Sequence, residues 1–258
     1  MLVIGLTLYF RIFESRLMFY PEKVLAEKPG IPHEDVRFNA ADGTRLHGWF
    51  LPFAGSHRVF LISHGNAGNI GDRAIMGEFV HQEFKENVFM YDYRGYGNSE
   101  GKPSEEGLYS DIRGAVAYLR SRGFDSSRLF LIGQSLGTAV TVDLASHEPV
   151  AGVILEAPFP SVSIFARRLA FSFPIDYFLR SHFDSLSKIS SIHAPIVVVH
   201  GRGDPVVPFD LGQQLFNGIP GRKKFFPANG EIHEGALMAL TPTQILELRD
   251  FLNIREVQ

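Results

Sequence analysis

Two segments of the chain carry the pattern Gly-x-Ser-x-Gly, in which a serine can be presented as a nucleophile. They are residues 97–101, centred on Ser99, and residues 133–137, centred on Ser135. The chemistry requires a sharp turn from a strand directly into a helix, because that turn lifts the serine Oγ into a cleft and directs the next backbone N–H at the developing oxyanion. The residues around each match therefore decide which serine is the better candidate.

Ser135 has the surroundings that this turn needs. The apolar run 128–132 comes just before it, and the helix-forming sequence LGTAVTVDLA follows it directly. Ser99 is separated from the apolar run before it by residues 94–96, and it leads into the Lys-Pro pair at 102–103. We therefore predict that Ser135 is the nucleophile and that Ser99 is a loop residue.

A serine hydroxyl is a weak nucleophile unless a positioned base removes its proton, and the base needs an acid to orient it. His233 lies in a glycine-flanked loop, residues 229–235, between the last predicted strand and the last predicted helix. Asp204 follows the apolar run 196–200, so both side chains are expected at the carboxyl edge of the sheet, where open α/β folds build their sites. Glu156, at the end of another apolar run, is the alternative acid.

The oxyanion of an acyl-transfer reaction needs two N–H donors. One is expected from Leu136, directly after the nucleophile, and the other from the loop HGNAGN at residues 64–69, whose small residues let backbone amides approach a substrate. Asn66 is the predicted donor in that loop. The same loop could instead cradle a phosphate, but neither G-x-x-x-x-G-K-[ST] nor G-x-G-x-x-G is present, so the pattern gives little support for nucleotide binding.

Composition excludes several other classes of protein. The 258 residues are 45% hydrophobic and 21% charged with a formal net charge of −3, which is typical of a folded globular domain and gives no basic surface for nucleic acid. The chain has no cysteine, so a disulfide framework, a thiolate metal site and a cysteine nucleophile are excluded. The predicted serine chemistry needs no metal and no organic cofactor.

Short apolar runs alternate with helical periodicity after Pro21, which predicts an α/β fold with a parallel sheet covered on both faces. The first two runs are expected to form an antiparallel pair around a turn at residues 41–43. The expected strands are residues 36–40, 45–51, 58–63, 87–91, 128–132, 150–155, 196–200 and 223–226. The expected helices are residues 70–84, 104–120, 136–147, 211–216 and 243–252.

Two segments do not follow this alternation. Residues 158–194 contain no strand candidate but are rich in phenylalanine, which predicts a lid insertion with Phe159, Phe165 and Phe171 lining an acyl pocket, or alternatively packing a small core of their own. Residues 1–20 are mostly apolar but too short and interrupted for a full membrane span. They are interpreted as a helix at a membrane interface, a shortened anchor, or a helix packed on protein, so the chain is expected to be membrane-associated or cytoplasmic.

Taken together, five separated motifs resemble the Bem-type abhydrolase-domain serine hydrolases of the α/β-hydrolase superfamily. The motifs are Tyr20-Pro21, HGNAGN at 64–69, YDYRGYGNSEGKPSEEGLYSD at 91–111, GQSLGTA at 133–139 and HGRGDPVVP at 200–208. The order Ser135, Asp204, His233 also matches the nucleophile, acid, base order of this superfamily. The sequence departs from the family pattern in two places. Thr138 stands where a small Gly or Ala commonly follows the nucleophile turn, and the insertion after Pro158 is rich in phenylalanine.

The resemblance implies an eight-stranded, mostly parallel sheet and an esterase, thioesterase or lysophospholipase type of activity. It implies Ser135, Asp204 and His233 as the triad, the amides of Asn66 and Leu136 as oxyanion donors, and an N-terminal membrane anchor. The predicted reaction is hydrolysis of an ester with a short to medium acyl chain, or of a single-chain lipid. Two alternatives stay open: a non-catalytic binding or scaffold protein with this fold, and an amide or peptide hydrolase that uses the same three residues.

Overall fold

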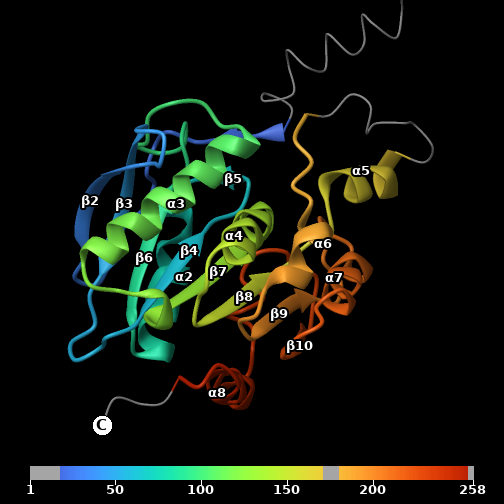
Figure 1. Ribbon diagram of the computed structural model, residues 1–258. Helices are drawn as coiled ribbons and strands as arrows, with labels where there is room; N and C mark the ends of the chain where they lie inside the picture. The colour runs from blue at the N-terminus through green and yellow to red at the C-terminus, as the bar shows by residue number, and fades with distance from the viewer. Residues whose placement is uncertain (1–17, 171–179, 255–258) are drawn as a thin grey trace, which may run out of the picture.

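The computed structural model describes residues 18–170 and 180–254 and contains one eight-stranded sheet (Figure 1). Its strands are β2 (Glu34–Asn39), β3 (Arg45–Leu51), β4 (Val59–Ser63), β6 (Asn87–Asp92), β7 (Leu129–Gln134), β8 (Gly152–Glu156), β9 (Ile196–Gly201) and β10 (Lys223–Ala228). They lie in the order β10-β9-β8-β7-β4-β6-β3-β2; β3 pairs antiparallel with both β2 and β6, and all other pairings in this sheet are parallel. The prediction of a mostly parallel eight-stranded α/β fold is confirmed.

The central strands are apolar throughout because helices cover both faces of the sheet. Along β4, Val59 and Leu61 join one apolar core, whereas Phe60 and Ile62 join the other. The neighbouring strand β7 is in register and divides its residues in the same way. This two-sided burial explains why these strands appear in the sequence as continuous apolar runs rather than alternating ones.

The helices are placed on the two faces by those cores. The described helices are α2 (Ala74–Phe84), α3 (Glu105–Ser121), α4 (Leu136–His147), α5 (Val162–Ala170), α6 (Ser185–Lys188), α7 (Phe209–Asn217) and α8 (Pro242–Phe251), with 3-10 turns at Ile70–Arg73 (η1), Ser126–Arg128 (η2) and Ile189–Ser191 (η4). Helices α3, α4 and α7 contribute to one core and lie in front of the sheet in Figure 1, and α2 and α8 contribute to the other.

The helix predicted over residues 70–84 is present over that range, but it begins as the 3-10 turn η1 and continues as α2 from residue 74. The cause is a local capping box: the Asn69 side chain accepts a hydrogen bond from the Gly71 N–H, and the Asp72 carboxylate accepts one from the Asn69 N–H. These bonds wind the first turn tightly. Arg73 closes that turn and points its side chain into the protein, where it is 6% exposed.

A second, very small sheet ties the start of the described chain to the loop after β4. Strand β1 (Tyr20–Pro21) pairs in parallel with β5 (Ala67–Gly68), and the Asn69 side chain donates to the carbonyl of Glu22. Of the predicted N-terminal helix 1–20, residues 1–17 lie outside the described residues, so its membrane interpretation stays a prediction. Among the residues that are described, no helix is both long and apolar enough to cross a membrane.

The insertion over residues 158–194 contains α5, α6 and η4, and its described part contains no strand. It is attached to the main domain by the backbone N–H groups of His182 and Phe183, which donate to the Glu105 carboxylate, and by the Phe183 side chain, which is fully buried. The Phe183 ring makes edge contacts with Phe19 and Tyr109. Phe171 lies in the segment 171–179, outside the described residues.

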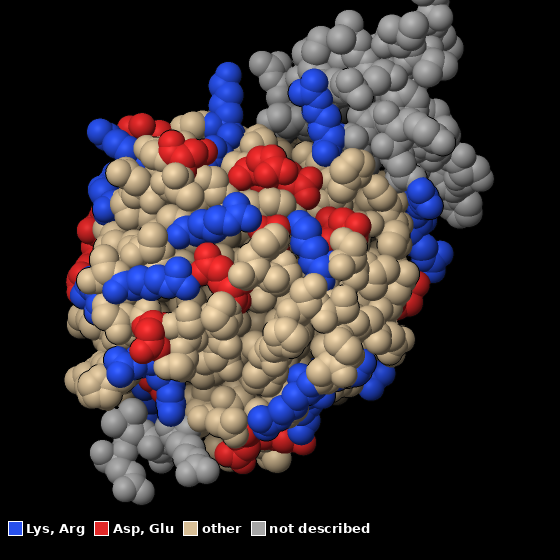
Figure 2. All heavy atoms as spheres, viewed as in Figure 1, with Lys and Arg blue, Asp and Glu red and all other residues tan. Residues whose placement is uncertain are grey.

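Charged side chains of both signs are interspersed over the face of the molecule in Figure 2. On that face no large area carries a single sign, in keeping with the small net charge of −3.

Candidate active site

Ser135 occupies a strained turn between β7 and α4. Strand β7 ends at Gln134 and α4 begins at Leu136, so a single residue separates strand from helix. That residue has φ +50° and ψ −115°, a backbone conformation that L side chains rarely adopt. The turn is held by the Ser135 N–H, which donates to the Glu156 carbonyl (2.9 Å). This is the strand-to-helix turn that the sequence predicted for residues 133–137.

The two glycines of this segment are needed for close packing. A Cβ added to Gly137 would lie 2.0 Å from the carbonyl oxygen of Ser63, and one added to Gly133 would lie 2.6 Å from the carbonyl oxygen of Gly137. Both distances are far shorter than any real Cβ contact. The absence of side chains at these positions lets the first turn of α4 sit directly against the end of β4.

His233 and Asp204 meet Ser135 from two other loops. The His233 Nε2 lies 3.1 Å from the Ser135 Oγ, and its Nδ1 lies 2.9 Å and 3.1 Å from the two Asp204 carboxylate oxygens. These three residues follow β7, β9 and β10, so they gather at the carboxyl edge of the parallel strands. The structure thus brings together the three side chains selected from the sequence, in the geometry of a nucleophile, a base and an orienting acid.

The Asp204 carboxylate is fully buried and well supplied with donors. Burial alone would raise its pKa, but hydrogen bonds from His200 and His233 and from the backbone N–H groups of Val206 and Val207 hold the pKa well below its usual range. The residue is therefore ionised at neutral pH. A fixed negative charge on this side favours the His233 tautomer that keeps Nε2 free to accept a proton.

The two residues predicted to supply the oxyanion donors lie on different elements. Leu136 is the first residue of α4, so its N–H has no acceptor within the helix. Asn66 lies in the loop after β4, where its side-chain amide donates to the Met18 carbonyl (2.5 Å) and its backbone carbonyl accepts from the Tyr96 hydroxyl (2.8 Å). The Asn66 side chain and carbonyl thus have partners of their own, and the oxyanion role of the Asn66 and Leu136 backbone N–H groups stays a prediction.

The two rival residues have other partners. The Ser99 Oγ donates to the Asp92 carbonyl (2.8 Å) and accepts from the His47 N–H (3.0 Å), and the side chain is buried. The Glu156 carboxylate accepts from the Leu237 N–H (3.1 Å) and from the Gln134 side chain (3.3 Å). Burial raises the pKa of Glu156. Ser99 is a loop residue, as expected, and Asp204 rather than Glu156 contacts the imidazole.

Of the three phenylalanines selected as pocket residues, two are described. Phe159 is buried and Phe165 is half-buried, with ring centroids 6.1 Å apart. Both belong to the apolar cluster that also contains Leu136. A side chain in this cluster can both pack against its neighbours and contact a substrate, so the role of these phenylalanines in an acyl pocket stays a prediction.

The sequence analysis missed several polar residues next to the site. His200 adds a contact to Asp204, with its Nε2 3.3 Å from the carboxylate. Arg73, Gln134 and Glu234 form a connected group behind His233. The available signal was positional: Gln134 and Glu156 are polar residues at the ends of adjacent apolar strands, and Glu234 directly follows His233.

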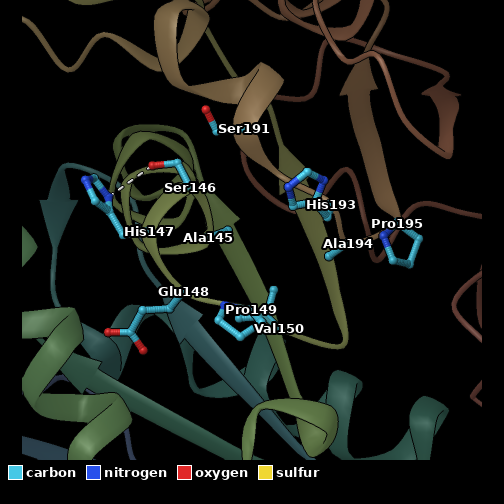
Figure 3. Close-up of a pocket in the computed structure, with 10 residues that line it drawn as sticks. All are labelled: Ala145, Ser146, His147, Glu148, Pro149, Val150, Ser191, His193, Ala194 and Pro195. Carbon is cyan, nitrogen blue, oxygen red and sulfur yellow. Dashed lines mark hydrogen bonds between the residues drawn. The ribbon is translucent and has the colours of Figure 1, made fainter.

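A separate hollow of about 470 Å³ lies at the opposite edge of the sheet (Figure 3). It is bordered by the end of α4 and by the residues that precede β8 and β9, including His147 and His193. It is thus remote from the carboxyl edge where Ser135 lies. Within residues 18–170 and 180–254, no group of three or more His, Asp or Glu side chains is arranged to hold a metal ion.

Comparison with known families and proteins gives consistent likenesses. The family model described as serine aminopeptidase, S33 matches residues 55–174, which include Ser135 and end before Asp204. An uncharacterised Mycobacterium tuberculosis protein, Rv2307c, is 33% identical over 235 residues, covering 89% of this chain and 83% of that protein. The human alpha/beta hydrolase domain-containing protein 17C is 40% identical over 182 residues, covering 70% of this chain and 54% of that protein.

Solved structures with the same architecture include two esterases. The Pyrococcus furiosus esterase Pf2001 aligns with a TM-score of 0.72 at 21% identity, covering 92% of this chain and 97% of that one. The esterase RhEst1 from Rhodococcus sp. ECU1013 aligns with a TM-score of 0.62 at 19% identity, covering 85% and 98%. Identities this low establish the shared fold and leave the activity to be argued from the site.

Proposed function

Because the chain belongs to the α/β-hydrolase superfamily, we propose that it is a serine hydrolase that cleaves carboxylic esters through an acyl-enzyme. The observation that carries the proposal is the continuous chain of hydrogen bonds from Asp204 through His233 to Ser135, at a strained turn between strand β7 and helix α4. Ser135 is the proposed nucleophile, His233 the base and Asp204 the acid that orients it.

In the proposed first step, the Ser135 Oγ attacks the ester carbonyl carbon while its proton passes to the His233 Nε2. The carbonyl oxygen becomes an oxyanion that accepts hydrogen bonds from the N–H groups of Leu136 and Asn66. The tetrahedral intermediate then expels the alcohol, which takes the proton from His233, and leaves an acyl group on Ser135. In the second step, a water molecule gives a proton to the His233 Nε2 and attacks the acyl carbonyl carbon. The bond to the Ser135 Oγ then breaks, the Oγ takes the proton back from His233, and the carboxylic acid is released.

Local electrostatics support this assignment. The ionised Asp204 stabilises the imidazolium that forms when His233 accepts the proton. The amino terminus of the twelve-residue helix α4 lies at Ser135, and its partial positive charge favours the developing oxyanion. The positive charge that forms on His233 and the negative charge that forms on the oxyanion are therefore both stabilised by groups that are already in place.

The proposed substrates are esters with short to medium acyl chains or single-chain lipids. Phe159 and Phe165 support an apolar acyl pocket because they extend the apolar cluster around Leu136 toward the insertion 158–194. Turnover of p-nitrophenyl esters from acetate to palmitate would test this directly, with Ser135→Ala as the control. We expect turnover that declines at the longest chains and is lost in the variant; hydrolysis that survives the substitution would remove the nucleophile assignment.

An amide or peptide substrate is the second candidate, favoured by the description of the matching family as a serine aminopeptidase. The same three side chains could serve, since the reactions differ mainly in the leaving group. Parallel assays with p-nitrophenyl esters and amino-acid p-nitroanilides distinguish the two. A non-catalytic scaffold would instead leave the folded protein unlabelled by a fluorophosphonate probe, which reacts with activated serines.

A further inference from the structure

A buried arginine lies where three loops of the site meet. Arg73, the last residue of η1, donates from Nη2 to a Glu234 carboxylate oxygen (2.5 Å) and from Nε to the Gln134 side-chain oxygen (3.1 Å). Its side chain is 6% exposed, whereas that of Glu234 is 45% exposed. A guanidinium binds two acceptors at once in a fixed plane, so these contacts set the relative positions of two different loops.

The residues that Arg73 contacts are chain neighbours of the reacting groups. Gln134 directly precedes Ser135, and Glu234 directly follows His233. The oxyanion loop reaches the same point, because a Cβ on Gly65 would lie 3.4 Å from both the Gln134 and the Glu234 acceptor oxygens. The nucleophile turn, the histidine loop and the oxyanion loop therefore meet at one guanidinium.

The same group of side chains also fixes the far end of the histidine loop. The Gln134 Nε2 donates to the Glu156 carboxylate (3.3 Å), whose other oxygen accepts from the Leu237 N–H (3.1 Å). The loop is thus held on both sides of His233, at Glu234 by Arg73 and at Leu237 by Glu156. A buried charge that loses its partner is strongly unfavourable, which gives this arrangement little freedom to shift.

We propose that Arg73 is a positioning residue for the reaction, holding the His233 loop against the Ser135 turn through Glu234 and Gln134. The inference rests on the proposed function, because the role it assigns is in the serine chemistry of that site. Without the guanidinium, the imidazole can move relative to the Ser135 Oγ. The loss should fall on the chemical step rather than on substrate binding.

The experiment compares Arg73→Gln, Arg73→Lys and Glu234→Gln with the wild type. It measures kcat and KM on a p-nitrophenyl ester and the rate of fluorophosphonate labelling, together with the urea midpoint of unfolding. Arg73→Gln should lower kcat and labelling about 10- to 100-fold with KM changed less than about threefold, since displacement of a catalytic group by 1 Å can cost that much. Arg73→Lys, which reaches one acceptor only, should lie between Arg73→Gln and the wild type.

A matched control is available in a buried ion pair elsewhere in the domain. Arg94 binds Asp111 (2.7 Å) and Asp42 (2.8 Å), and Asp111 is fully buried. Arg94→Lys should lower the urea midpoint and leave kcat and labelling within about twofold, because the pair lies outside the three loops described above. This separates loss of a buried charge pair from loss of a positioned imidazole.

Three results would overturn the proposal in distinguishable ways. The positioning role alone would be refuted if the wild type is active and both Arg73→Gln and Glu234→Gln keep kcat and the labelling rate within twofold of the wild-type values. A rise in KM with kcat and labelling unchanged would assign Arg73 to substrate binding instead. A folded wild type that neither hydrolyses esters nor becomes labelled would refute the proposed function and the role of Arg73 with it. If Arg73→Gln does not fold, the half-exposed Glu234 still decides the question through Glu234→Gln.

Discussion

The two Gly-x-Ser-x-Gly segments share the same glycine, serine and glycine spacing but differ in the elements and side chains that surround the serine. In residues 133–137 the serine stands alone between strand and helix, and its Oγ faces His233. In residues 97–101 the serine is buried, and its Oγ is already bonded to the Asp92 carbonyl and the His47 N–H. A pattern of residue types therefore does not specify which serine has a base beside it, and only the neighbouring elements supply that base.

The glycines of the two segments also serve different ends. Gly133 and Gly137 remove side chains that would collide with backbone, so that α4 can approach β4. Gly97 and Gly101 instead have φ of +43° and +85°, values that a turn in a loop requires, and a Cβ on Gly97 would lie 2.0 Å from the buried Asp92 carboxylate. The same spacing thus arises from close packing in one segment and from turn geometry in the other.

The largest expected contrast between the segments is the effect of removing each hydroxyl. Ser135→Ala should lower kcat for ester hydrolysis by roughly 10⁴- to 10⁶-fold, since the proposed acyl-enzyme forms on the Ser135 Oγ. Ser99→Ala should keep kcat within about twofold but lower the free energy of unfolding by about 1–3 kcal/mol, because the buried His47 N–H loses its acceptor. Steady-state kinetics and urea unfolding of both variants measure the contrast. Equal kinetic losses in the two variants would mean that the surroundings do not distinguish the serines.

A second contrast concerns the acid. The Ser135 Oγ is linked through His233 to the Asp204 carboxylate, whereas the contacts given above for the Ser99 Oγ are to backbone groups. Asp204→Asn should lower kcat by about 10²- to 10⁴-fold, because the neutral side chain no longer favours the His233 tautomer that accepts a proton. The measurement is kcat for a p-nitrophenyl ester at neutral pH. A variant with wild-type kcat would show that another carboxylate, such as Glu156, orients the imidazole.

The same substitution has a pH-dependent effect on stability. The hydrogen bonds to Asp204 hold its native pKa well below its usual range, and the unfolded chain has a pKa of about 3.9 at this residue. The ionised carboxylate therefore stabilises the fold above about pH 4, and this stabilisation is lost as the pH falls below 4 toward the native pKa. Urea unfolding at pH 6, 4 and 3 should show the wild type losing its advantage over Asp204→Asn. An advantage that is constant with pH would contradict the shifted pKa.

How much of the fold and of the site could be predicted from the sequence depends on how far apart in the chain the interacting residues lie. The strands and the Ser135 turn follow from local sequence: β-branched runs predict buried strands, and a serine between such a run and a helical segment predicts the turn. Asp204 and Glu156 could not be separated with certainty from sequence, because both follow strands at the same edge. The contacts of Arg73 could not be predicted at all, since its partners lie 61 and 161 positions away along the chain.

The 3-10 turn at the start of the helical segment 70–84 was not predicted, for a related reason. Apolar periodicity continues through residues 70–84, but the side chains of Asn69 and Asp72 cap a tight first turn, which periodicity does not register. The side chain of Asn66 gives a second example. Its amide nitrogen donates to the Met18 carbonyl and its amide oxygen accepts from the Tyr96 hydroxyl (3.2 Å); one partner lies before it and one well after it in the chain, so no local pattern marks them.

The smallest expected effect joins the two segments. Tyr96, immediately before the segment 97–101, donates its hydroxyl to the backbone carbonyl of Asn66 (2.8 Å), and burial raises the pKa of Tyr96 well above its usual range, so it stays a donor at neutral pH. Tyr96→Phe should lower kcat about two- to fivefold through a looser oxyanion loop and lower the free energy of unfolding by about 1 kcal/mol. Tyr118→Phe, at an exposed hydroxyl bonded to Arg122, is the matched control. A stability loss with unchanged kcat would mean that the segment 97–101 supports the fold without influencing the reaction at Ser135.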